Sequence, residues 1–366
     1  MLPAFCVLEI SLARKQRSVV ADLRSFSIMK ALNWFSGLWL SVVHGLASAF
    51  LLFVHRSLFW NINVLFDGPL WITFAECMFT VVVCLIRLRS SSFSIVRSLR
   101  QGFLGAAKEH SLNIKLSLAF SLMIICNNLC LYYMDMPMYF VARSLAVPIS
   151  LTFTYRSRSV NNCVGVLLGA LLVIVGYIVT LIEENLTNLL IAEGIVFGVL
   201  ASLFVVIYYQ EASRLASGNN YDVHLKQVYV NNVVCSLITL IAIAFTETSE
   251  LMFLPYSLYL ETILFWSLIA LSCITSSFVG TVVLREATTL STGRRELIGL
   301  LRSLLQTILA VIIFRVYTTG FWWVGVLLTA VGSAIYWRAY MIHVTDPPST
   351  NGIAKDGLPL VNNLTD

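Results

Sequence analysis

The sequence predicts an all-α integral membrane protein in which ten transmembrane helices form two pseudo-symmetric five-helix repeats. Three observations lead to this prediction. The 366 residues are 58% hydrophobic and only 12% charged, with a mean hydropathy of +0.84. The chain contains ten apolar runs close to the ~20 residues that a membrane-spanning helix needs. A short motif around an arginine also recurs in each half of the apolar region, at Arg143 and Arg302.

The composition excludes several classes of protein. Soluble domains are about 25% charged, so a chain with half that charge needs lipid to solvate much of its surface. Disordered, fibrous and nucleic-acid-binding proteins are excluded on the same count. The eight cysteines form no CxxC pair, and the five histidines lie far apart in no metal-binding motif. We therefore expect no disulfide framework, no metal site and no cofactor.

The apolar runs define the expected domain organisation. Residues 1–34 are predicted to be a cytosolic tail, 35–342 a ten-helix domain and 343–366 a disordered cytosolic tail. The two repeats are expected at about 35–182 and 189–342. The ten predicted helices are 35–55, 69–87, 114–133, 136–155, 160–182, 189–209, 228–246, 262–284, 297–315 and 320–342.

The distribution of basic residues sets the expected orientation. With both ends of the chain in the cytosol, 20 of the 24 Lys and Arg residues fall on the cytosolic side, two on the opposite side and two inside helices. Such an excess of positive charge is typical of the cytosolic loops of membrane proteins. Asn185 begins an Asn-X-Thr sequon that is lumenal in this topology, so it is a candidate glycosylation site.

Arg143 and Arg302 are the most informative residues, because they lie within predicted spans in the similar contexts ARSL and LRSL. An arginine at mid-membrane costs at least about 2.5–3.5 kcal/mol, so it is expected in a polar cavity with a partner. Two arginines from corresponding helices of two repeats could form a bidentate clamp for phosphate or diphosphate. The alternative is that each arginine pairs with a membrane carboxylate such as Glu76 or Glu193.

Other polar side chains within the predicted helices are further candidates. They can hold helices together through hydrogen bonds, or they can bind the polar edge of a base or a sugar. These residues are Asn127, Asn128, Tyr139, Tyr229, Asn231 and Asn232. No GxSxG, P-loop, GxGxxG or paired-carboxylate signature accompanies them, so the sequence predicts a binding protein without a reaction centre, and not an enzyme.

Four short motifs follow one another along the chain. They are Asn127–Tyr133 (NNLCLYY) with the RSL of the predicted helix 136–155, Val196–Leu203 (VFGVLASL), Tyr229–Asn232 (YVNN) and Gly299–Arg302 (GLLR). In their order and spacing they resemble the nucleotide-sugar transporters of the drug/metabolite transporter superfamily, and most of all the GDP-fucose transporter branch. YVNN resembles the FYNN nucleotide-recognition motif of that branch, and GLLR resembles its G-x-x-K motif. The likeness spans roughly residues 35–342.

The resemblance implies a nucleotide-sugar antiporter that imports GDP-fucose or a related GDP-sugar into the Golgi lumen, in exchange for GMP, by alternating access. The endoplasmic reticulum is the alternative compartment. The implied partners are a nucleotide sugar, a nucleoside monophosphate and membrane lipid, without nucleic acid, and a homodimer is compatible with the resemblance.

The resulting hypothesis assigns a role to each candidate residue. The diphosphate lies between Arg143 and Arg302 at the repeat interface. Gly299 lets the sugar approach the backbone of the predicted helix 297–315. Polar side chains of the predicted helices 114–133 and 228–246 complete the site. Asn127 and Asn128 line the cavity. The nucleotide is contacted by Tyr229, Asn231 and Asn232.

Three departures from the family pattern leave alternatives open. Phe140 stands where Asn is usual, Ala142 where Gly is usual and Arg302 where Lys is usual. Arg in place of Lys keeps the charge but changes the hydrogen-bond geometry. The alternatives are a carrier of another nucleotide sugar or of a sugar phosphate, and a degenerate, non-transporting relative that acts as a membrane interaction partner.

Overall fold

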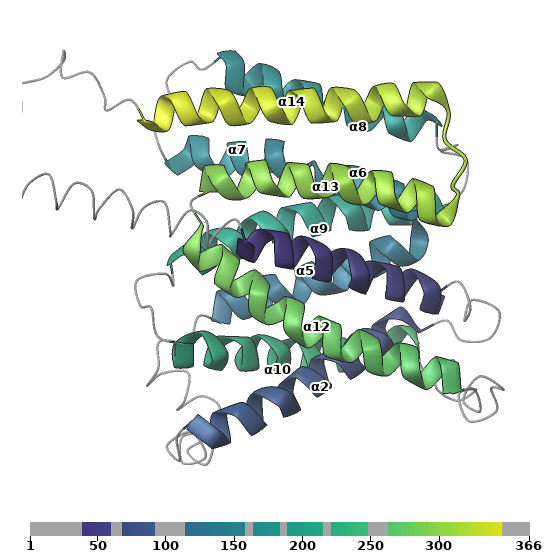
Figure 1. Ribbon diagram of the computed structural model, residues 1–366, viewed down its shortest axis with the longest axis vertical. Coiled ribbons are helices and arrows are strands. Elements are labelled where there is room, and N and C mark those ends of the chain that lie inside the picture. Colours follow the sequence, from purple (N-terminus) through teal and green to yellow (C-terminus); the bar gives the residue numbers. More distant parts are fainter. Residues whose placement is uncertain are drawn as a thin grey trace, which may run out of the picture.

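The computed structural model describes residues 39–59, 68–91, 114–157, 164–183, 189–214, 221–247, 263–290 and 292–345. All regular elements within these ranges are helices that pack side by side. Most of their axes are roughly parallel, and some are inclined to the rest (Figure 1). The predicted tail 1–34, the glycosylation candidate Asn185 and the residues after 345 lie outside the described residues.

The helices overlap each of the ten predicted runs. Nine segments within the described residues are long and apolar enough to cross a membrane, which agrees with an integral membrane protein. The helices are Trp39–Phe59, α2 (Pro69–Ser91), α5 (Ile114–Tyr133), α6 (Met136–Arg143), α7 (Ala146–Ser157), α8 (Val164–Glu183), α9 (Leu189–Arg214), α10 (Tyr221–Thr246), α12 (Ile263–Thr289), α13 (Thr292–Phe314) and α14 (Gly320–Thr345).

Most helix boundaries differ from the predicted ranges by several residues, and three of these differences have a clear physical reason. The predicted helix 136–155 is two helices, α6 and α7. Helix α10 begins at Tyr221 instead of 228, because helical backbone continues through a polar first turn that hydropathy does not detect. Helix α13 begins at Thr292, and its apolar part, Leu301–Phe314, is shorter than the nine candidate spans because charged residues occupy its first turns.

The break between α6 and α7 follows from Pro148, which has no backbone N–H and obstructs a continuous helix. The chain tightens into i→i−3 bonds instead: Ser144 N donates to Val141 O at 3.0 Å and Val147 N donates to Ser144 O at 3.0 Å. The carbonyl of Phe140, which a regular helix would pair with the N–H of Ser144, accepts a hydrogen bond from the Ser303 hydroxyl at 3.1 Å. The break therefore ties the end of α6 to α13.

Glycines allow α8 and α14 to pack backbone against backbone. A Cβ atom placed on Gly169 would lie 2.7 Å from the carbonyl oxygen of Gly332, and one on Gly176 would lie 2.7 Å from that of Gly325. Both helices thus have two glycines seven residues apart, which meet in antiparallel order. Small residues of this kind permit the close approach of membrane helices. We call this contact, formed by the four glycines, the glycine seam.

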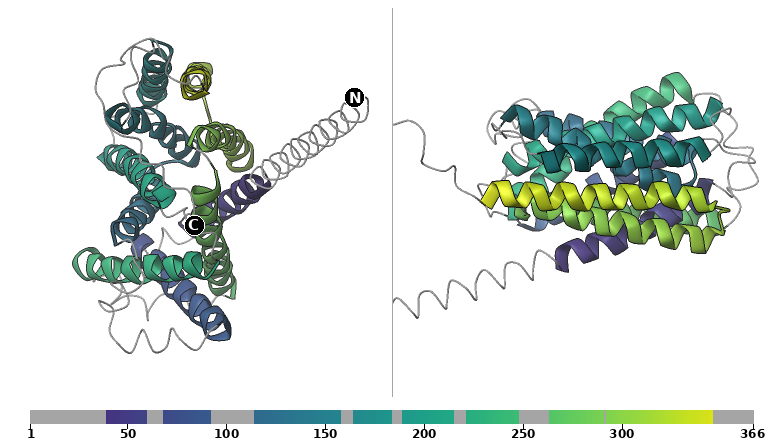
Figure 2. Two further views of the ribbon diagram at one scale, coloured as in Figure 1. Left: turned by 90° about the vertical axis from the view of Figure 1, so that its left-hand side faces the viewer. Right: turned by 90° about the horizontal axis from the view of Figure 1, so that it is seen from above.

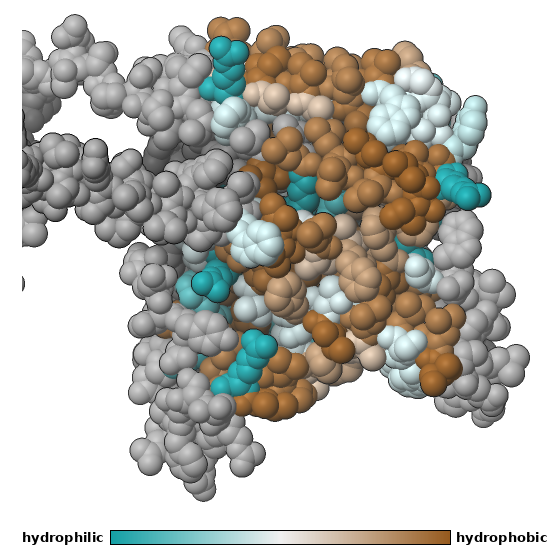
Figure 3. All heavy atoms as spheres, in the orientation of Figure 1, coloured by the Kyte–Doolittle hydropathy of each residue, from teal (hydrophilic) through white to brown (hydrophobic). Residues whose placement is uncertain are grey.

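The bundle is elongated in cross-section, with α8 and α14 at one end and α2 at the other (Figure 2). Helix α5 packs on α9, α10 on α2 and α13 on α6, while α2 and α9 also contact α12. Buried polar side chains occupy the interior, and large apolar side chains such as Leu167, Ile178 and Phe278 are exposed on the outer faces. The face drawn in Figure 3 is mostly hydrophobic between its two edges, as a lipid-facing surface should be.

Candidate functional site

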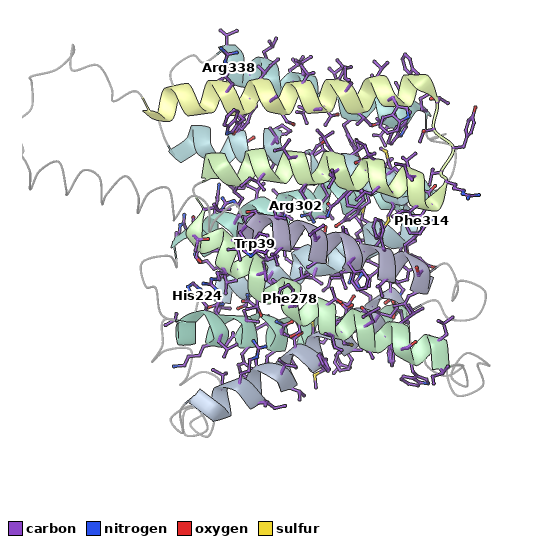
Figure 4. All side chains as sticks on the ribbon, in the orientation of Figure 1. Trp39, His224, Phe278, Arg302, Phe314 and Arg338 are labelled. Carbon is purple, nitrogen blue, oxygen red and sulfur yellow. The ribbon has the colours of Figure 1, made fainter. Side chains whose placement is uncertain are left out.

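A cavity of about 210 Å³ lies between the two halves of the chain. Its walls come from helix Trp39–Phe59, α5, α6, α7, α9, α12, α13 and α14, so both predicted repeats contribute. The predicted site residues on its wall are Arg143, Arg302, Asn127, Asn128, Tyr139 and Gly299. Figure 4 labels Arg302 in the middle of the bundle, where α13 runs beside helix Trp39–Phe59.

Arg143 ends α6 at the helix break and is held by neutral partners. Its NH1 nitrogen donates to Asn127 Oδ1 at 2.8 Å and to the Tyr139 hydroxyl at 3.3 Å. The Tyr139 hydroxyl also donates to Asn127 Oδ1, at 3.3 Å. Among the described residues, no carboxylate forms an ion pair with Arg143. These contacts fix the position of the guanidinium and leave its positive charge uncompensated at the cavity wall.

Arg302 is instead part of an ionic cluster. Its NH1 nitrogen is 3.5 Å from Glu286 Oε2 on α12, and it contacts the ring of His44. His44 Nδ1 also contacts Glu286, which accepts a further hydrogen bond from the Ser41 hydroxyl at 2.9 Å. Glu286 is fully buried. A buried carboxylate with several partners can remain ionised, so the charge of Arg302 is largely balanced within the protein.

The two arginine environments occupy equivalent positions in the two halves of the sequence. Arg302 lies 159 residues after Arg143, and Glu286 lies 159 residues after Asn127. Each arginine therefore contacts the residue that precedes it by 16 positions, on the preceding span. The first half supplies a neutral amide where the second half supplies a carboxylate. Because of this substitution, Arg302 is balanced by a carboxylate, and Arg143 has no such partner among the described residues.

The expected alternative, in which Glu76 or Glu193 neutralises an arginine, differs from what the structure contains. Glu193 is exposed, and Glu76 pairs with His55 at 2.5 Å. The carboxylate that pairs with Arg302 is Glu286, which lies two residues beyond the predicted helix 262–284. The equal spacing of the two arginine–partner pairs is the signal in the sequence that could have identified it.

A third arginine was not anticipated as a cavity residue. Arg295 lies in the first turns of α13, is buried, and stacks over the Tyr209 ring with its guanidinium carbon 4.4 Å from the ring centroid. It precedes the predicted helix 297–315 and so falls among the basic residues expected on the cytosolic side. Together with Gly299 and Arg302 it lines the cavity along one face of α13. The i, i+4, i+7 spacing of these three residues is the pattern that could have revealed this face.

Gly299 borders open space, since a Cβ atom built on it would meet no atom of the described residues within 4 Å. The other glycines of the membrane helices mostly face neighbouring helices closely. Because no packing contact requires a glycine at this position, its lack of a side chain enlarges the cavity.

The residues of the YVNN motif lie away from this cavity. Asn231 Oδ1 accepts hydrogen bonds from Ser117 and Gln227, both at 2.8 Å, and Asn232 donates to the Val228 carbonyl at 2.8 Å. These bonds connect α5 with α10 or remain within α10. Tyr229 is half-buried and packs against the cluster around α2, α5 and α10. The three residues therefore make interhelical and local contacts in this conformation.

No family model matches the chain. The Golgi GDP-fucose transporter of Drosophila melanogaster is 26% identical over 297 residues, which cover 80% of this chain and 86% of that protein. The GDP-fucose transporter of Caenorhabditis elegans is 26% identical, covering 78% of this chain and 77% of the relative. GDP-fucose transporter 1 of Mus musculus is 25% identical, covering 85% and 86%.

A protein of known crystal structure shares the fold, with a TM-score of 0.52 at 14% identity, covering 82% of this chain and 98% of its own. The chain is thus related in sequence to nucleotide-sugar transporters of the GDP-fucose branch. The similar proteins are named as transporters and not as enzymes, in agreement with the non-enzymatic role that the sequence predicts.

Proposed function

We propose that this chain, a relative of the GDP-fucose transporters, is a GDP-sugar antiporter of the Golgi membrane. It imports GDP-fucose or a related GDP-sugar in exchange for GMP. The single observation that carries the proposal furthest is the arginine at the cavity wall, Arg143, whose described partners are all neutral. A cationic group in a membrane cavity is suited to an anion such as a diphosphate. The relatives are named GDP-fucose transporters, which supports a GDP-sugar as this anion.

We further propose that the ten helices form two five-helix repeats. The helix contacts support this arrangement, because the second, fourth and fifth helices of one half pack on those of the other: α2 on α10, α6 on α13 and α8 on α14. The end of α14 and the beginning of helix Trp39–Phe59 lie on the same side of the bundle in Figure 1, as an even number of crossings requires.

The charges suggest how exchange is achieved. In the empty carrier, Arg143 is a poorly solvated cation, and a bound phosphate would balance it. Reorientation is therefore easier with an anion bound, which favours exchange over one-way transport. Arg302 contributes once the phosphate competes with Glu286 for its guanidinium. The diphosphate then lies between the two arginines, with Arg295 nearby on α13 and Gly299 providing room for the sugar.

Purified protein in liposomes tests this function. We expect uptake of labelled GDP-fucose into vesicles that contain GMP and little uptake into vesicles without it. Equal rates in both would contradict obligatory exchange. A competition panel of GDP-, UDP- and CMP-sugars identifies the base, and sugar phosphates test the alternative substrate class.

A non-transporting relative remains the second candidate, supported by Phe140 and Ala142 in place of the usual Asn and Gly. It predicts neither uptake nor a nucleotide-dependent increase in melting temperature. Tagged protein that colocalises with an endoplasmic reticulum marker, and not with a Golgi marker, would contradict the proposed compartment.

A further inference from the structure

We propose that His55 binds ligand at the end of the cavity that lies away from Arg302, along helix Trp39–Phe59. Its Nδ1 atom accepts a hydrogen bond from a hydroxyl or ring N–H group at an end of the ligand remote from the phosphates. This inference rests on the proposed function and adds a subsite to it. None of the motifs that carry the family resemblance includes His55.

The first step is the unpaired nitrogen. His55 is 2% exposed, and its Nδ1 atom is buried with no hydrogen-bond partner among the described residues. The residue nevertheless lines the cavity. A buried polar atom without a partner is costly and therefore uncommon in native proteins. A ligand in the cavity would supply the missing partner.

The second step is the orientation of the ring. His55 Nε2 lies 2.5 Å from Glu76 Oε1 and 3.0 Å from the Ser272 hydroxyl oxygen. Ser272 also donates to Glu76. An ionised carboxylate only accepts hydrogen bonds, so Nε2 carries the ring proton. In the neutral ring, Nδ1 then presents a lone pair, and the contacts with α2 and α12 hold the ring in place.

The third step is the distance from the arginines. His44, which contacts Arg302, and His55 are eleven residues apart on the same helix, roughly 16 Å at about 1.5 Å per residue. Ser48 and Leu52, which lie between them, also line the cavity. An inorganic phosphate cannot reach both ends. A diphosphate with a base on one side and a sugar on the other can.

Two substitutions separate binding from folding. His55→Gln places an amide near the position of Nε2, so it keeps a partner for Glu76 and removes the ligand contact. His55→Asn places a polar atom near the position of Nδ1, so it keeps the ligand contact and loses Glu76. We expect the Gln variant to be the more stable of the two in a thermal melt. We expect it to bind GDP-fucose about tenfold more weakly than wild type, with the Asn variant within about threefold.

The affinity of the Gln variant for GMP identifies the ligand group. A loss for GDP-fucose alone supports a sugar hydroxyl, and equal losses for both support a group of the nucleoside. Unchanged affinity for both would overturn the inference, as would an Asn variant that binds more weakly than the Gln variant. If wild-type protein binds neither nucleotide, the proposed function itself fails, and this inference fails with it.

Discussion

The two arginine sites differ in one partner, and that difference separates their roles. Asn127 accepts a hydrogen bond from Arg143 with its neutral amide oxygen, whereas Glu286 at the equivalent sequence position forms an ion pair with Arg302. A symmetric pair of free arginines would bind an anion strongly and release it slowly. A symmetric pair of balanced arginines would bind it weakly. The asymmetric arrangement lies between these limits, which suits a carrier that must both bind and release its ligand.

Removal of Arg143 should have the largest effect. We expect Arg143→Ala to weaken GDP-fucose binding by about 100-fold or more, because two charge-assisted hydrogen bonds are lost. Arg143→Lys should retain part of the binding, because it keeps the charge without the planar geometry. The matched control is Arg338→Ala, since Arg338 is exposed on the outer face of α14 (Figure 4). Equilibrium binding in nanodiscs measures all three, and near-wild-type affinity of Arg143→Ala would remove this residue from the site.

Asn127→Asp makes the first site resemble the second. The new carboxylate should pair with Arg143 and compete with the ligand phosphates, so we expect about tenfold weaker binding. Side-chain size is nearly unchanged, and a melting temperature close to that of wild type serves as the folding control. Affinity equal to that of wild type would show that the charge balance of Arg143 does not control binding.

Glu286→Gln makes the second site resemble the first. The ion pair is lost while the amide can still bond to Ser41, so Arg302 becomes available to phosphate. We expect about fivefold tighter binding together with slower exchange, because release becomes harder. Binding and exchange rates from the same preparation check this. Weaker binding would mean that Glu286 positions Arg302 for the ligand instead of competing with it.

Arg295→Ala should have the smallest effect. Its guanidinium stacks on Tyr209 and lines the cavity, without belonging to either arginine pair. We expect about a threefold rise in the KM for uptake with little change in the maximal rate, through weaker attraction of the anion. An effect as large as that of Arg143→Ala would place Arg295 in direct contact with the phosphates. It would contradict a site in which only Arg143 and Arg302 hold them.

Hydropathy predicted the helices well, because lipid demands long apolar runs wherever the chain spans the membrane. It does not predict the division of the fourth helix into α6 and α7, because the run 136–155 is apolar on both sides of Pro148. Polar helical ends such as the start of α10 carry no hydropathy signal. These errors concern short segments where backbone geometry, and not burial in lipid, determines the structure.

The candidate site was predicted in part. Charges within apolar runs pointed to Arg143 and Arg302, which line one cavity. Arg295 lies just outside the predicted helix 297–315, where a basic residue is ordinary, so the sequence does not single it out. His44 and His55 belong to no sequence motif, and they lie far apart from the other histidines and from each other. Their separation of three helical turns on one helix is what brings both to the cavity, and a pairing across helices such as that of His44 with Glu286 is not visible in a single sequence.

The glycine seam has a consequence for motion. At its contacts even a methyl group would overlap the opposing backbone, so α8 and α14 cannot slide past each other without first separating. If one half rotates against the other, we expect the glycine seam to act as the hinge axis. The seam lies at one end of the elongated bundle, and the same small rotation there would displace α2, at the opposite end, the furthest.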